Sequence, residues 1–78
     1  MSYKITYVIL NQKKEQSIDF KNIVAVNDDE AKEYFRDFHK KTYEMEEDFF
    51  GKKYFARELI KINDCCGKET IVMSEGIY

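Results

Sequence analysis

The 78-residue chain contains no proline and no tryptophan, and its three glycines are isolated from one another. Without proline the sequence has no rigid linker, and a hydrophobic content of 44% gives little indication of disorder. Apolar runs such as Val8-Ile9-Leu10 are far too short for a signal peptide or a membrane span. These absences predict a single globular domain, residues 1–78, located in the cytoplasm.

Residues suited to catalysis or metal binding are also few. His39 is the only histidine, and the isolated glycines cannot form a phosphate-binding loop. Cys65 and Cys66 are adjacent, and with one histidine they are too few for a zinc site within one chain. The two thiols fit either a plain turn in a reducing compartment or a redox or metal-binding role across a dimer. We therefore expect a protein that is not an enzyme and that holds no metal or other cofactor.

The charges are unevenly distributed along the chain, although the net charge is only −2. Residues 28–50 contain nine acidic and four basic side chains, whereas the remaining residues contain six acidic and nine basic ones. The small negative total does not favour tight non-specific binding to nucleic acid. The sequence thus predicts one acidic segment in an otherwise mildly basic chain.

Four segments have the β-branched and aromatic composition that is typical of strands, at residues 3–10, 15–26, 52–63 and 68–73. The last of them extends either to residue 73 or to residue 77. In the second segment we expect Ile18 and Phe20 to face the core, followed by either Val24 and Val26 or Ile23 and Ala25. A break in the alternation at Lys21-Asn22 predicts a β-bulge there. Unbroken alternation in the third segment would place Ala56 and Ile60 on one face, and Arg57 and Leu59 on the other.

The acidic segment between the second and third strands is predicted to be a helix over residues 28–50. Asn27 is a suitable N-cap, with Glu30 three positions later. At 100° per residue one line of the helix surface carries apolar or small side chains. These are Ala31, Phe35, Phe38, Thr42, Met45 and Phe49. Gly51 can end the helix, because glycine readily adopts the left-handed conformation of a C-terminal cap. A helix of this length is expected to extend beyond the sheet by a turn or two.

The order of elements predicts an α+β fold, ββαββ, with one long helix packed on one face of a four-stranded, mainly antiparallel sheet. Two strand orders, 2-1-3-4 and 1-2-4-3, satisfy the short connections equally well. Several strands carry apolar side chains on both faces, but a single helix covers only one face. The second face is therefore expected to be partly exposed or to form an interface, for example that of a homodimer.

The end of the predicted helix is the strongest functional signal in the sequence. Glu44, Glu46, Glu47 and Asp48 lie where the helix dipole favours cations, so their charge opposes the stability of the helix. They form either a solvated face neutralised by nearby lysines or a site that binds a basic surface of a protein partner. Such a partner could be a host complex whose basic surface normally holds nucleic acid. In this second interpretation Tyr43 and Phe50 are candidate anchors.

A basic and aromatic sheet face is the alternative functional interpretation. Lys53, Arg57 and Lys61 lie on the third strand, and sheets with basic and aromatic side chains bind single-stranded nucleic acids in several domain families. The opposing interpretation is that the aromatic residues belong to the core and that the lysines protect a sheet edge. A protein-interaction module is the leading prediction.

The segment Ile23-Val24-Ala25-Val26-Asn27-Asp28-Asp29-Glu30-Ala31 resembles the strand-to-helix junction of small phage and mobile-element proteins of the DpnD/PcfM-like group. The resemblance covers about residues 18–40 and consists of a capping residue and the first inward helical residue. In size and charge distribution the chain is also similar to anti-CRISPR proteins. These resemblances imply a phage- or mobile-element-encoded inhibitor that occupies a basic surface of a host defence complex. They identify no functional residues.

Overall fold

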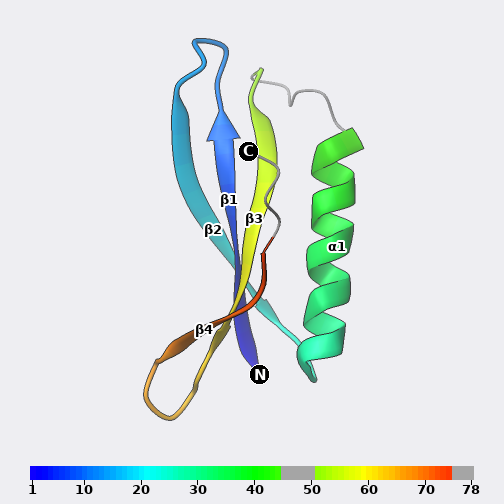
Figure 1. The fold of residues 1–78 in the computed structure, drawn as a ribbon, viewed down its shortest axis with the longest axis vertical. Helices are drawn as coiled ribbons and strands as arrows, with labels where there is room; N and C mark the ends of the chain where they lie inside the picture. Colours follow the sequence, from blue (N-terminus) through cyan, green and yellow to red (C-terminus); the bar gives the residue numbers. More distant parts are fainter. Residues whose placement is uncertain (45–50, 75–78) are drawn as a thin grey trace.

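A computed structural model describes residues 1–44 and 51–74 of the chain, and the elements follow in the order ββαββ (Figure 1). The strands are β1 (Ser2–Leu10), β2 (Gln16–Val24), β3 (Lys53–Ile62) and β4 (Glu69–Ser74), and the helix is α1 (Asp28–Glu44). The predicted α+β fold is confirmed. Within the described residues no helix is long and apolar enough to cross a membrane.

The four strands form one antiparallel sheet in the order β2-β1-β3-β4, the first of the two orders that the sequence left open. Among the four described strands, β1 and β3 have neighbours on both sides and β2 and β4 lie at the edges. The two central strands also have the most buried side chains, whereas β2 is exposed along nearly its whole length. Central strands of a sheet are shielded on more sides than edge strands, so this burial pattern follows from the strand order.

Helix α1 begins where the sequence predicts, because Asn27 caps it. The Asn27 side-chain oxygen accepts a hydrogen bond from the Glu30 backbone N–H at 2.9 Å, and its carbonyl accepts the Ala31 N–H at 3.2 Å. Asp28, Asp29 and Glu30 then place negative charge in the first turn, where the helix dipole favours it. The predicted continuation through residues 45–50 lies outside the described residues.

Asn27→Ala is expected to destabilise the protein by about 1 kcal/mol, because it leaves the Glu30 N–H without its capping acceptor. The free energy of unfolding from urea denaturation measures the effect. Asn22→Ala, at an exposed position in β2, is the control and should change stability by no more than about 0.5 kcal/mol. Equal losses in the two variants would contradict the capping role of Asn27.

The core lies between the helix and one face of the sheet. Ala31 and Phe35 of the helix are fully buried, and Phe38 packs at the margin of the core. On the sheet side the buried cluster comprises Tyr3, Ile5, Ala25, Ala56 and Leu59. The predicted apolar line along the helix is therefore confirmed for its described members, including Thr42, which is buried. Met45 and Phe49 lie outside the described residues.

The prediction that Ile18 and Phe20 face the core is wrong. They pair with Val8 and Thr6 on the sheet face away from the helix, and both are more than half exposed. Ile23 packs against the core, and the pairing of β2 with β1 continues without interruption from there. With a period of two, unbroken pairing places the even-numbered residues of β2 on the opposite face. The predicted bulge at residues 21–22 is therefore wrong as well.

The irregularities of the sheet lie on the β3 side instead. Thr6 pairs with Glu58 but Tyr7 pairs with Ala56, which leaves Arg57 as an extra residue in β3. This bulge places both Ala56 and Leu59 on the core side, so the predicted unbroken alternation in the third strand is wrong. A second register shift between β3 and β4 falls between Leu59 and Ile60. Beyond the first bulge, Glu58 and Ile60 pair with Thr6 and Lys4 on the face away from the helix.

Candidate functional site

The end of the described helix carries the only part of the predicted acidic site that the structure places. Tyr43 is 70% exposed, and its ring centroid lies 6.1 Å from that of His39. Glu44, the last residue of α1, is also exposed. The other predicted members, Glu46, Glu47, Asp48 and Phe50, lie outside the described residues. Figure 1 shows the described helix within the length of the sheet, so the predicted extension beyond the sheet concerns residues 45–50 alone.

The three basic residues of the alternative site are not brought together on one surface. Lys53 is paired with Leu10 on the face away from the helix, where its Nζ lies 5.4 Å from the Phe55 ring centroid. Lys61 is paired with Tyr3 on the core side, near the other end of β3. Arg57 is the extra residue at the bulge between them. Lys61 follows Lys53 by eight positions along the strand, a distance of about 26 Å, and the two side chains leave opposite faces.

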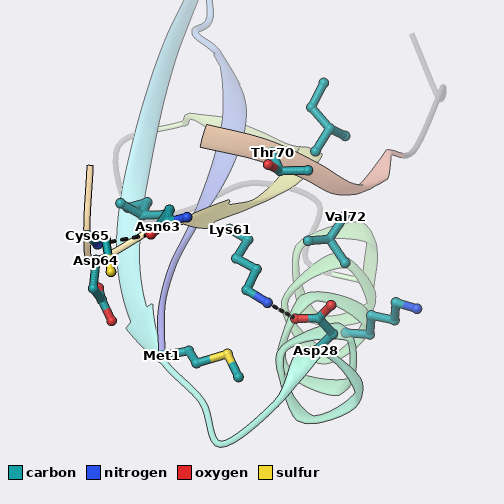
Figure 2. A pocket seen from close by; sticks show the side chains of 11 residues that line it. Met1, Asp28, Lys61, Asn63, Asp64, Cys65, Thr70 and Val72 are labelled. Atoms are coloured by element: carbon teal, nitrogen blue, oxygen red, sulfur yellow. Dashed lines mark hydrogen bonds and ion pairs between the residues drawn. The ribbon is translucent and has the colours of Figure 1, made fainter. Parts of the chain in front are cut away.

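A groove of about 680 Å³ lies where the start of α1 meets the ends of β3 and β4 (Figure 2). Its lining includes Asp28 and Lys32 from the helix, Lys61 from β3 and Thr70 from β4. The Lys61 Nζ lies 3.4 Å from the Asp28 Oδ1, and Figure 2 shows the two side chains pointing toward one another. Within this groove the acidic and basic groups partly neutralise each other.

Tyr3 completes a polar network beneath this groove. It is fully buried, and its hydroxyl donates a hydrogen bond to the Asp28 Oδ1 at 2.5 Å. Burial, the hydrogen bond to Asp28 and the charge of that carboxylate together raise the pKa of Tyr3 to about 12. The pKa of Asp28 is lowered, chiefly by the Tyr3 hydrogen bond and further by Lys61 and Lys32, although desolvation opposes this shift. The network joins β1, α1 and β3.

Sequence reasoning did not find this network. Each member had another explanation: Tyr3 as a strand residue, Asp28 as the first residue of the acidic helix and Lys61 as a candidate nucleic-acid contact. Tyr3 is 25 residues from Asp28 along the chain. No local pattern links residues that far apart, so only the strand order and register bring them together.

The adjacent cysteines lie in the turn between β3 and β4. Both thiols are free and exposed. The turn is closed by Asn63, whose carbonyl accepts the Gly67 N–H at 2.7 Å and whose side-chain oxygen accepts the Cys65 N–H at 2.9 Å. Gly67 has φ 70°, a left-handed conformation that glycine adopts readily. In the described part of the chain no group of three or more His, Cys, Asp or Glu side chains could hold a metal ion.

Comparisons with known proteins do not assign the chain to a family. No family model, curated protein or solved structure matches it.

Proposed function

We propose that this protein is a protein-interaction module that binds a basic surface of a partner through the end of its helix. The observation that supports the proposal is the exposure of Tyr43 beside the exposed Glu44, at the start of an acidic stretch. From Glu44 to the next basic residue, Lys52, the sequence contains four carboxylates and no cation. An aromatic side chain next to charges of one sign combines an apolar anchor with electrostatic recognition.

The helix dipole gives a reason to regard this acidity as functional. At the end of α1 a carboxylate such as that of Glu44 is disfavoured by roughly 0.3–1 kcal/mol. A partner that supplies cations would reverse this effect on binding, since each carboxylate would then gain a nearby opposite charge. We further propose that the partner is a host protein whose basic surface normally holds nucleic acid. The protein would then act as an anti-CRISPR-like inhibitor encoded by a phage or a mobile element.

Reversing Glu46, Glu47 and Asp48 to lysine is expected to abolish partner binding while leaving the melting temperature equal or higher. Binding is lost because lysines repel a basic surface, whereas positive charge that follows the end of α1 in the sequence does not oppose the helix dipole. Immobilised wild-type and variant proteins are compared by affinity capture from the native host, followed by titration of the captured protein. Capture should also weaken with added salt, because exposed charges are screened beyond about 8–10 Å at physiological ionic strength.

The control variant reverses Asp29, Glu33 and Asp37, three exposed acidic residues toward the other end of the helix. It changes the net charge by the same amount, so it should still capture the partner if the position of the acidic cluster matters. Unchanged capture by the variant at residues 46–48 would contradict the proposal. Equal loss in both variants would show that total charge, rather than this site, controls binding.

Nucleic-acid binding is tested in parallel by fluorescence titration with DNA and RNA at low and high salt. The proposal predicts no binding under either condition, since Lys53 and Lys61 leave opposite faces of β3. Binding at low salt that is lost on replacing Lys53 and Arg57 with alanine would favour the alternative function.

A further inference from the structure

The sheet face away from the helix carries a group of exposed apolar side chains. This open face consists of Lys4, Thr6, Val8 and Leu10 of β1 and the residues paired with them on the neighbouring strands. Phe20, Ile18 and Ile71 are 52%, 61% and 59% exposed. Through pairing they lie next to Thr6, Val8 and Ile60, which are nearly buried. The exposed side chains thus surround buried ones on a continuous surface.

A surface of this kind is unusual for a protein that remains monomeric. Large contiguous apolar patches on soluble proteins mark interaction sites, whereas single exposed apolar residues need no explanation. Stable domains cover both faces of a sheet that is apolar on both. Among the described elements only α1 packs on the sheet, and it covers the opposite face (Figure 1). Within the described residues nothing covers the open face, so its apolar side chains are available to a second layer.

The charges on the open face are balanced, which distinguishes it from the acidic end of the helix. Lys4 forms an ion pair with Glu69 at 2.6 Å, and its Nζ lies 5.2 Å from the Phe20 ring centroid. Lys53 and Glu58 lie on the same face through their pairing with Leu10 and Thr6. The four charged residues that pairing places on this face, two lysines and two glutamates, sum to zero, so they give no preference for a strongly charged partner. The face is compatible with itself, as a two-fold symmetric interface requires.

We infer that the open face binds a second copy of this chain, sheet against sheet. The two sheets would form the inner layers and the two helices the outer layers, so both copies would cover their apolar side chains. With strands about 30 Å long and spaced about 4.8 Å apart, the faces bury about 1,000 Å² in total, the lower limit for a specific interface. The dimer therefore dissociates on dilution, and α1 with Tyr43 and Glu44 stays on the outside.

Sedimentation equilibrium over micromolar to near-millimolar concentrations tests this inference. The wild-type mass should rise from 9.4 kDa toward twice that value as the concentration increases. Phe20→Glu and Ile71→Glu should each weaken the dimer more than about tenfold, because each buries an unpaired charge in the interface. Both variants should remain folded by circular dichroism, since each residue is more than half exposed in the monomer.

Val26→Glu is the matched control. Val26 is 74% exposed but lies beyond the end of β2, so this variant should dimerise like the wild type.

A wild type that stays monomeric at the highest concentration would overturn the inference. So would a dimer that survives both open-face substitutions, since that result would indicate pairing through a sheet edge. If the wild type is monomeric and Phe20→Glu no longer captures a host protein, the open face would instead bind that host protein. Reversal of Glu46, Glu47 and Asp48 should leave the mass unchanged, which separates this test from that of the proposed function.

Discussion

Phe35→Ala is expected to destabilise the protein by about 3–5 kcal/mol. Phe35 is fully buried and belongs to the cluster that joins the helix to Tyr3, Ile5 and Leu59 of the sheet. Alanine loses the transfer free energy of the ring and leaves a cavity that the surrounding side chains fill only in part. A domain of this length has a total stability of about 4–12 kcal/mol, so this loss removes at least about a quarter of the total and unfolds the protein if its stability lies at the lower end.

Urea denaturation followed by circular dichroism measures this loss, and the preceding residue supplies the control. Tyr34 is 44% exposed and donates its hydroxyl to the Glu30 carboxylate at the surface. Tyr34→Ala should therefore cost no more than about 1 kcal/mol. Similar losses at the two positions would contradict the orientation of the helix, because a rotation of about 100° exchanges their environments.

The helix could be predicted from the sequence because its signals are local. Asn27 caps the first turn within three residues, and the spacing of Ala31, Phe35 and Phe38 identifies the buried line with no knowledge of what it packs against. Both predictions depend only on helix geometry, and the structure confirms both. The acidic continuation of the helix, with Glu46, Glu47 and Asp48, stays a prediction.

The second strand was predicted less well because its sequence allows two opposite orientations. Ile18 and Phe20 share one face while Ile23 shares the other with Lys21, so hydrophobicity alone does not identify the core side. The structure resolves this in favour of Ile23, next to Tyr3, and leaves Phe20 outside. Orientation in such a strand is set by register against the neighbouring strand, which the sequence of one strand does not contain.

The strand order had a signal in the sequence. Residues 3–10 carry apolar side chains on both faces, whereas residues 16–22 include polar or charged residues on both. A strand that is apolar on both faces belongs in the middle of a sheet, and this favours the order that the structure shows. The bulge at Arg57 has no such signal, because it becomes apparent only in the pairing of Thr6 and Tyr7 with β3.

Tyr3→Phe is expected to destabilise the protein by about 1–2 kcal/mol near neutral pH. It removes the hydrogen bond from the buried hydroxyl to the Asp28 carboxylate, while Lys61 remains as a partner of that carboxylate. The ring itself is retained, so no large cavity forms and the loss is attributable to the hydroxyl. The free energy of unfolding of the two proteins, measured by urea denaturation, gives this difference directly.

The difference in the free energy of unfolding between the wild type and Tyr3→Phe should depend on pH in both the acidic and the alkaline range. The pKa of Asp28 is lowered by folding, so its stabilisation is present above the unfolded value of about 3.9 and is lost as the pH falls through the folded value. The pKa of Tyr3 is raised to about 12, so its contribution is present below the unfolded value of about 10 and is lost as the pH rises toward 12. The advantage of the wild type should therefore be constant from about pH 5 to about pH 9 and shrink outside that range.

Tyr34→Phe is the control for this pH dependence, because its hydroxyl is bonded to the Glu30 carboxylate at the surface at 3.2 Å. Solvent replaces that bond readily, so the variant should lose less than about 1 kcal/mol of stability.

Ultraviolet titration of phenolate formation should also show one fewer tyrosine ionising near pH 12 in Tyr3→Phe than in the wild type. A wild-type advantage that stayed constant through both pH ranges would mean that the Tyr3 hydroxyl and the Asp28 carboxylate are not coupled. The start of α1 would then be held to β1 by apolar packing and by the backbone hydrogen bonds between Met1 and Ala25, without a contribution from the Tyr3 hydroxyl.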